Sequence, residues 1–347
     1  MNKSSVSWPG KSRKQSIRIV ALGGGTGLSM LLRGLKHHVA SRPEELARPD
    51  KYPIADLVAV VTVTDDGGSS GRLRREYSIL PPGDIRNCLV GLSEDEALLG
   101  RLFQYRFPVG RALAGHSFGN LFLTALTNVT GDFPEAVRFS GQVLAIRGRI
   151  YPSTTANVTL EALLEDGKRV RGETRISHSR RRIRRVKLVP SSARPLPEVL
   201  EAIREADLIL MGPGSLYTSI IPNLLVRGVA EAIRKSRGKC VYISNLMTQP
   251  GETDGYSLTD HVRAVYEHAH EGLFDSVIVN RTRISADVLR RYRREGAEQV
   301  GAEPGDMRRM GISVISDDLL QSGQVVRHDH MRLARLILSK CGIALRR

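Results

Sequence analysis

The chain has 347 residues, enough for about two domains of average size. Apolar residues make up 41% and charged residues 25%, as in ordinary globular proteins, and no apolar run approaches the roughly 18 residues of a membrane span. This composition excludes a disordered, fibrous or membrane-spanning protein, while the net charge of +16 indicates an anionic partner such as nucleic acid, anionic lipid or a phosphorylated ligand.

The N-terminus and the cysteines bear on location and redox state. Residues 1–16 are basic and polar without an apolar core, which predicts a disordered basic tail and no secretory signal, so we expect a cytoplasmic protein. Cys88, Cys240 and Cys341 are far apart and odd in number. This spacing favours buried reduced thiols over disulfides or a thiolate metal site.

From residue 17 onward, short apolar runs alternate with amphipathic segments, a pattern typical of a parallel sheet covered by helices. We predict a strand over residues 17–22 and, after a glycine turn at 23–27, a helix over 28–37. A second strand is expected over 56–63, after a polar loop at 41–52. Helical patterns follow at 85–91, 94–103, 117–128 and 133–144.

The pattern changes over residues 149–189. Here apolar and polar residues alternate with a period of two on either side of an Asp-Gly turn at 165–167, which predicts a small antiparallel β insertion. Strands are expected again at 207–211, 239–244, 276–280 and 312–315, with helices between them. The prediction is therefore an α/β protein with a doubly wound, mostly parallel Rossmann-like sheet. Residues 17–148 and 190–347 would form one nucleotide-binding domain interrupted by the β-rich subdomain at 149–189.

Two glycine-rich turns follow predicted strands and are candidate phosphate sites. Residues 23–27 contain four glycines, which let backbone N–H groups approach an anion at the start of the next helix. The turn matches neither the P-loop nor the G-x-G-x-x-G fingerprint, since Leu28 stands at the third glycine position. Residues 212–219 repeat the arrangement in the second half of the chain, and residues 245–253 add amide and hydroxyl groups suited to sugar or base recognition.

The second predicted strand ends in paired carboxylates. Asp65 and Asp66 precede a run of glycines and serines, and Asp84 follows at the start of a predicted helix. Two carboxylates at a strand end suit Mg²⁺ coordination beside phosphates, a ribose contact or general-base catalysis; the alternative is a solvated turn. His116 to Asn120 open another helix and place an imidazole and an amide near helix N-terminal donors.

Six motifs carry a family resemblance: GGGTGLSMLLRGLK, TVTDDGGSSGRLRREY, PPGDIRNCLVGLS, GHSFGNLFL, ADLILMGPGSLYTSIIPNLLV and SNLMTQPGET. In this order they resemble the bacterial gluconeogenesis factor (YvcK-like) family, which is related to the 2-phospho-L-lactate transferases of deazaflavin coenzyme biosynthesis. The resemblance implies a cytoplasmic, Rossmann-like protein that binds a nucleotide sugar of the UDP-N-acetylglucosamine type and supports growth and cell shape on gluconeogenic carbon sources.

The resemblance also implies which residues line the nucleotide cleft. The predicted nucleotide contacts are Gly23, Gly24, Gly25, Thr26, Gly27, Asp65, Asp66, Ser69, Ser70, Arg86, Asn87, His116, Asn120, Gly212, Gly214, Ser215 and Thr218. Asp65, Asp66 and Asp84 are the candidate catalytic residues, and Asp65 and Asp66 the candidate Mg²⁺ ligands. We also expect a homo-oligomer.

Three alternatives remain. The first is an Mg²⁺-dependent enzyme of the phospholactyl transferase type, although no counterpart of the deazaflavin-binding segments can be identified in the sequence. The second is an NAD site, with an acidic residue about forty positions beyond the first turn, where roughly twenty is usual. The third, nucleic-acid binding, is the weakest, because no reading motif or aromatic platform is present.

Most of the excess charge is local. Residues 168–194 contain eleven basic residues and one acidic residue, Glu173, and so supply +10 of the +16. More arginines lie at 281–294, whereas the glycine-rich loops add little. The basic segment at 168–194 predicts a solvated face or a contact with a polyanion or a protein, separate from the small-molecule site.

Overall fold

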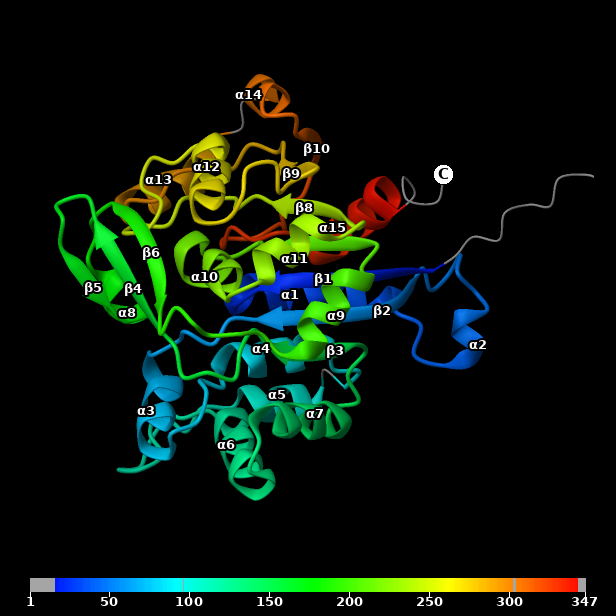
Figure 1. Ribbon diagram of the computed structural model, residues 1–347, viewed down its shortest axis with the longest axis vertical. Helices are drawn as coiled ribbons and strands as arrows, with labels where there is room; N and C mark the ends of the chain where they lie inside the picture. Colours follow the sequence, from blue (N-terminus) through cyan, green and yellow to red (C-terminus); the bar gives the residue numbers. More distant parts are fainter. Residues whose placement is uncertain (1–15, 96, 302–303, 343–347) are drawn as a thin grey trace, which may run out of the picture.

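The fold is organised around one parallel sheet of seven strands. The computed structural model describes residues 16–95, 97–301 and 304–342, so the predicted disordered tail lies outside the described residues except for Ser16. The strand order is β10-β9-β8-β7-β1-β2-β3, and every pairing between neighbours is parallel. This is a doubly wound sheet whose order reverses between β1 and β7, and the predicted α/β class is confirmed (Figure 1).

The strands of this sheet form at buried apolar runs close to those predicted from the sequence. They are β1 (Ile17–Gly23), β2 (Ile54–Val61), β3 (Arg149–Pro152), β7 (Leu208–Met211), β8 (Lys239–Ile243), β9 (Ser276–Asn280) and β10 (Ser313–Asp317). All four residues of β7 are buried, as is every residue of β1 except Arg18, which is expected of strands covered on both faces.

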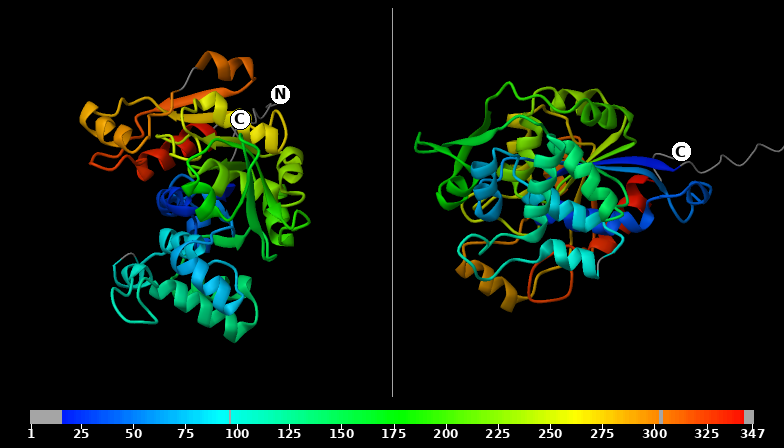
Figure 2. Two further views of the ribbon diagram at one scale, coloured as in Figure 1. Left: turned by 90° about the vertical axis from the view of Figure 1, so that its left-hand side faces the viewer. Right: turned by 90° about the horizontal axis from the view of Figure 1, so that it is seen from below.

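Helices cover both faces of the sheet (Figure 2). On one side α1 packs against α4 and α15, and on the other α9 packs against α11. The helices of the first half are α1 (Gly25–Leu35), α2 (Pro43–Leu46), α3 (Gly68–Tyr77), α4 (Gly83–Leu92), α5 (Leu98–Gln104), α6 (Phe118–Thr130) and α7 (Phe133–Val143). Those of the second half are α9 (Pro197–Glu205), α10 (Ile221–Leu225), α11 (Val229–Lys235), α12 (Leu258–His268), α13 (Ala286–Arg294), α14 (Pro304–Arg309) and α15 (His330–Leu336).

The antiparallel sheet starts later than predicted. Residues 149–152, assigned to the insertion from the sequence, form β3 and extend the main sheet beside β2. The short, partly polar RIYP segment has no apolar run, so only its tertiary pairing identifies it as a strand of the main sheet. The insertion itself comprises β4 (Thr159–Leu164), β5 (Arg169–Arg171), α8 (Glu173–His178) and β6 (Ile183–Val189), in the order β5-β4-β6.

The predicted Asp-Gly turn joins β4 and β5, and its Gly167 has a φ of +81°, which glycine adopts at little cost. The polar loop at 41–52 contains one short helix, α2. No helix in the described part of the chain has both the length and the apolar character needed to cross a membrane.

Candidate functional site: a cavity at the switch point and an adjoining acidic cluster

The first glycine turn joins β1 to α1 and leaves helix donors open. Gly24 caps α1 with no side-chain hydrogen bond, and the first turn of the helix contains no acidic residue. The first intrahelical bond, from Leu28 N to Gly24 O, is long at 3.5 Å. Gly25 has a φ of +60°, and a methyl group placed on it would meet no atom within 4 Å. Beyond Gly25, whose N–H donates to Asp84, this end of α1 therefore presents N–H groups and positive dipole charge to open space.

The second turn packs against the first so closely that glycine is required. A methyl group on Gly27 would lie 2.2 Å from the carbonyl oxygen of Pro213. Asn245 fixes the neighbouring Gly214: its Oδ1 accepts from Gly214 N at 3.1 Å, and its Nδ2 donates to Gly214 O at 2.9 Å. The two turns and the loop after β8 thus form one rigid surface.

A cavity of about 530 Å³ lies on this surface, at the point where the strand order reverses. Six of the predicted nucleotide contacts line it: Gly24, Gly25, Thr26, Gly27, Gly214 and Ser215. The loop after β8 contributes Asn245 to Pro250, and the rest of the lining is Met30, Leu31, Pro213, Ser219, Tyr292, Glu295, Ala297, Val326, Arg327, His328, His330 and Leu333. Its polar groups are mostly uncharged, which suits a ligand whose recognition depends on hydroxyl and amide groups.

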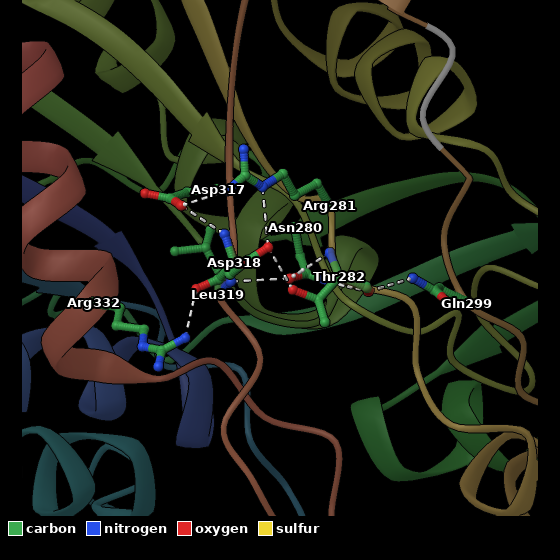
Figure 3. Close-up of polar contacts among 8 residues, drawn as sticks. All are labelled: Asn280, Arg281, Thr282, Gln299, Asp317, Asp318, Leu319 and Arg332. Carbon is green, nitrogen blue, oxygen red and sulfur yellow. Dashed lines mark hydrogen bonds and ion pairs between the residues drawn. The ribbon is translucent and has the colours of Figure 1, made fainter.

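The far wall of the cavity was not predicted from the sequence. It is built from α13 and the segment before α15, which are joined by a bond from Val326 N to Tyr292 Oη at 3.0 Å. Below them the ends of β9 and β10 are tied together, with Asn280 Oδ1 accepting from Leu319 N and Thr282 Oγ1 donating to Asp318 (Figure 3). These residues have no local motif, because the wall exists only when two loops remote in sequence meet.

Gln249 and His328 in the cavity lining each have a buried polar atom without a hydrogen-bond partner among the described residues. One is Gln249 Oε1, whose amide partner Nε2 donates to Ser215 Oγ at 2.7 Å. The other is Nε2 of His328, a side chain only 8% exposed, and burial lowers the pKa of His328 to about 4. Buried polar groups are normally paired, so these two atoms are available to a ligand.

Beside the cavity, across the Gly24 turn, four carboxyl groups gather: Asp65, Asp84, Glu173 and Glu252. A methyl group on Gly24 would come within 2.7 Å of Asp84 Oδ2, and the Gly25 backbone N–H donates to this carboxylate. Burial, and then the charge of Asp65, raises the pKa of Asp84 to about 6.

Glu173 and Glu252 complete this acidic cluster from the other side. Thr64 Oγ1 donates to Glu173 Oε2 at 3.1 Å, and burial, followed by the nearby Asp84 and Asp65, raises the pKa of Glu173. Glu252 is only 4% exposed, and burial raises its pKa as well. Its Oε1 accepts from Thr218 Oγ1 at 3.2 Å, whereas its Oε2 has no partner in the part of the chain that the structure describes.

Asp65 and Asp66, which the sequence pairs, point to different neighbours. Asp65 Oδ1 accepts from Gly67 N at 2.9 Å, and its Oδ2 faces Gly83 at the start of α4. Asp66 Oδ1 accepts from both N and Oγ1 of Thr174 in α8, at 2.9 and 2.7 Å. Asp66 therefore holds the insertion in place, and the two carboxylates do not converge as a pair.

The donors present do not make a complete metal site by themselves. Within the described ranges, no three carboxylate, imidazole or thiolate groups are close enough together to hold an ion. A Mg²⁺ ion at this position would use Asp65 together with phosphate oxygens and water, which is the way Mg²⁺ is commonly bound beside nucleotides.

Other predicted site residues lie in a buried network away from the cavity. Ser69 Oγ and His116 Nδ1 are 2.9 Å apart, and Asn120 Nδ2 donates to the same hydroxyl at 3.1 Å. Arg86, 7% exposed, donates to Ser117 Oγ and Asn120 Oδ1, and burial lowers its pKa to about 10. These contacts join the N-terminal ends of α3, α4 and α6. None of these side chains lines the cavity, so the structure does not bring these predicted nucleotide-binding residues together with the glycine turns that form it.

The remaining predicted residues do not line the cavity either. Ser70 lies against Gly83, Asn87 accepts from Arg86, and Thr218 belongs to the acidic cluster. Gly23 and Gly212 lie one residue inside the turns that form the cavity floor.

The insertion reaches the site, which overturns the expectation that the basic segment is separate from it. Helix α8 supplies Glu173 to the acidic cluster, and Ser177 Oγ donates to Glu252 Oε1 at 3.2 Å. On the β6 side, Val186 N donates to Nε2 of the buried His268 at 2.9 Å. The insertion thus bridges the loops after β2 and β8 at the carboxyl end of the main sheet.

The strand order and the glycine-lined cavity at its reversal define a doubly wound α/β protein of the Rossmann type. A family model described as 2-phospho-L-lactate transferase CofD matches residues 19–320. The gluconeogenesis factor of Bacillus subtilis (strain 168) is 48% identical over 325 residues, which cover 93% of this chain and 98% of that protein. The gluconeogenesis factor of Halalkalibacterium halodurans is 46% identical over 321 residues, 92% of this chain and 95% of that one.

A crystal structure of a UPF0052 family member from Bacillus halodurans is also similar, with a TM-score of 0.86 and 45% identity, covering 93% of this chain and 99% of that chain. The chain therefore belongs to the CofD/UPF0052 family and is a homologue of the gluconeogenesis factors. The resemblance inferred from the six motifs is confirmed.

Proposed function

We propose that the protein acts as a gluconeogenesis factor that binds a nucleotide sugar of the UDP-N-acetylglucosamine type in the cavity at the switch point. In this role it would support growth and cell shape on gluconeogenic carbon sources, in the cytoplasm. The observation that carries the proposal is the cavity itself, which combines a helix N-terminus whose Thr26 and Gly27 N–H groups face it with a lining of mostly neutral polar groups.

The N–H groups at the start of α1 and the neutral polar side chains of the lining suggest how such a ligand would lie. The diphosphate would accept from the N–H groups of Thr26 and Gly27 and lie against Gly214, where α1 presents its positive end. Hydroxyl and amide groups of the ligand would pair with Gln249 Oε1 and His328 Nε2, buried atoms without partners among the described residues. At neutral pH His328 is uncharged, because its pKa is near 4, and it acts as a hydrogen-bonding group and not as a cation.

The NAD alternative receives less support from this arrangement. In Rossmann dinucleotide sites an acidic residue after the second strand contacts the ribose. Here Asp65 and Asp66 bond to Gly67 and Thr174, and the residues that line the cavity come from the β1, β7 and β8 side together with the C-terminal segments.

An enzyme of the phospholactyl transferase type is the second candidate, and the acidic cluster favours it. With its pKa near 6, Asp84 lies in the range useful for general acid–base catalysis, and its carboxylate accepts from the Gly25 N–H, next to the proposed anion site at Thr26 and Gly27. Bound Mg²⁺ would neutralise charge on a diphosphate. Asp84 would accept a proton from an attacking hydroxyl, and Glu173 would hold the Thr64 hydroxyl beside it.

Calorimetric titration with UDP-N-acetylglucosamine tests the first proposal. We expect saturable binding to the wild type and at least tenfold weaker binding to Gln249→Ala, which removes a direct cavity contact. Asn128→Ala, a change on the far side of α6, serves as the matched control and should bind like the wild type. Absence of heat at millimolar ligand with a folded protein would refute nucleotide-sugar binding. Release of nucleoside monophosphate from a lactyl diphosphonucleoside, lost in Asp84→Asn, would favour the enzyme instead.

A further inference from the structure

Two arginine-rich segments of the chain border the cavity. The two arginine-rich segments, residues 168–194 and 281–294, are far apart in sequence. Both the insertion and α13 nevertheless lie at the carboxyl end of the parallel strands, the end at which the cavity forms (Figure 1). Contacts of α13 and of the insertion with the residues that line the cavity place both segments beside it.

Helix α13 borders the cavity on one side. Its Tyr292, and Glu295 just after it, line the cavity, while none of the residues in this helix is buried. Arg293 and Arg294 are exposed, next in sequence to these lining residues, and neither makes an ion pair among the described residues. Arg281, by contrast, is occupied by Asp317 and Asp318 at the base of the wall (Figure 3).

The insertion borders the cavity on the other side. Pro250 lines the cavity, and a methyl group on the next residue, Gly251, would lie 2.6 Å from Ser177 O and 3.3 Å from Arg180 Cα. The Arg182 guanidinium lies 5.8 Å from the ring centre of Tyr256 in the same loop, although its charge is paired with Glu165 at 3.6 Å. A methyl group on Gly296, beyond α13, would also lie 3.8 Å from Pro250. The loop after β8 is therefore flanked by both basic segments.

The interior of the cavity does not supply the same charge. Apart from histidines, its charged lining residues are Glu295 and Arg327, which cancel. A ligand that carries a diphosphate would therefore be held inside by backbone N–H groups and neutral side chains, and attraction over distance must come from outside.

We propose that Arg180, Arg293 and Arg294 form a cationic rim that steers diphosphate-bearing ligands into the cavity. This inference rests on the proposed function, because it assumes an anionic ligand at the α1 N-terminus. Charges that border a cleft raise the association rate of an oppositely charged ligand by about 10- to 1,000-fold at low salt. The effect falls as salt screens it, since the Debye length is about 10 Å at 0.1 M.

The test compares two charge reversals of equal size. The rim variant is Arg293→Glu with Arg294→Glu. The matched control is Arg42→Glu with Arg48→Glu, two exposed positions beside α2 at the opposite end of the sheet (Figure 1). Each pair changes the net charge by the same amount, and thermal unfolding of both variants checks that they remain folded.

With UDP-N-acetylglucosamine as the probe, calorimetry gives Kd and phosphorus NMR line shapes give the dissociation rate. At low salt we expect the association rate of the rim variant to fall about tenfold with an unchanged dissociation rate, and the control to change less than twofold. The difference should disappear near 0.5 M salt. Equal association rates in the two variants, or an effect in the dissociation rate alone, would overturn the rim. A wild type that does not bind would instead refute the proposed function.

Discussion

The substitution Thr26→Glu tests the anion site at the start of α1 directly. Thr26 is an exposed residue in the first turn of this helix, beside Gly25 and Gly27, and the turn contains no acidic residue. A glutamate here would place a negative charge in the position proposed for the diphosphate. Because acidic side chains are favourable at helix N-termini, the same change should raise the free energy of unfolding by about 0.3–1 kcal/mol. The affinity for the ligand should therefore fall while the free energy of unfolding rises.

The loss of affinity follows from Coulomb's law. Two unit charges about 5 Å apart repel by about 3 kcal/mol at an effective dielectric constant of 20 and by about 0.8 kcal/mol in bulk water. With two phosphate charges at an exposed residue, we expect a loss of about 2 kcal/mol, or roughly 30-fold in Kd. The loss should grow as salt is lowered.

Calorimetric titration with UDP-N-acetylglucosamine measures this loss, and inorganic pyrophosphate probes the anion site without the nucleotide. Thr26→Gln, which is equal in size but uncharged, is the control and should keep its affinity within a few-fold. If Thr26→Glu binds both ligands as tightly as Thr26→Gln at low salt, the phosphate does not lie at the N-terminus of α1, and the assignment fails.

Three further substitutions test the surroundings of the cavity. The folded-state pKa of Asp84, near 6, lies above its ordinary value of 3.8, so its contribution should raise the free energy of unfolding by about 2 kcal/mol as pH falls from 7 to 4; Asp84→Asn should lose this gain in denaturant titrations at the two pH values. Asp66→Ala removes both bonds to Thr174 and should speed amide hydrogen exchange in α8 by about tenfold or more. Gly27→Ala would press a methyl group against Pro213 O and should lower the free energy of unfolding by about 1–3 kcal/mol.

Gly27→Ala and Asp66→Ala each have a control in the same chain. Gly214→Ala meets its nearest atoms at 3.6 Å, an ordinary contact, and should cost less than Gly27→Ala. Asp166→Ala removes an exposed ion pair with Arg181 and should leave hydrogen exchange in α8 nearly unchanged. Equal effects in a variant and its control would show that the contact named here is not the cause. An Asp84→Asn protein with the same pH dependence as the wild type would mean that this carboxyl does not titrate near 6.

The parts of the site that the sequence predicts are those formed by neighbours in the chain. The turns around Gly25 and Gly214 combine glycine with a preceding apolar strand, and both lie in the cavity. Asp65 and Asp66 show the limit of such local patterns. Only the docking of α8, which brings Thr174 to Asp66, separates their roles, and adjacent residues give no sign of it.

Residues supplied by distant loops could not be predicted in this way. Tyr292 and His328 lie in segments without a glycine or acidic motif, and they reach the cavity because β9 and β10 carry them to the same end of the sheet. Glu173 was counted only as the single acid of a basic run, yet it joins the acidic cluster through Thr64. The basic segment at 168–194 therefore contains both Glu173, a member of the acidic cluster, and part of the proposed cationic rim, and neither role follows from the sequence pattern alone.

The shared helix end at Gly25 also couples ligand binding to protonation. Asp84 accepts from the Gly25 N–H, and the proposed diphosphate would accept from the next two N–H groups, so both anions draw on the same positive end of α1. A bound diphosphate would raise the pKa of Asp84 above 6, and binding would take up a fraction of a proton near pH 6.5. Affinity should then increase as pH falls from 7.5 to 6, and calorimetry in buffers of different ionisation enthalpy would measure the proton uptake. Asp84→Asn should remove both effects, and binding by the wild type with no proton uptake at pH 6.5 would contradict the coupling.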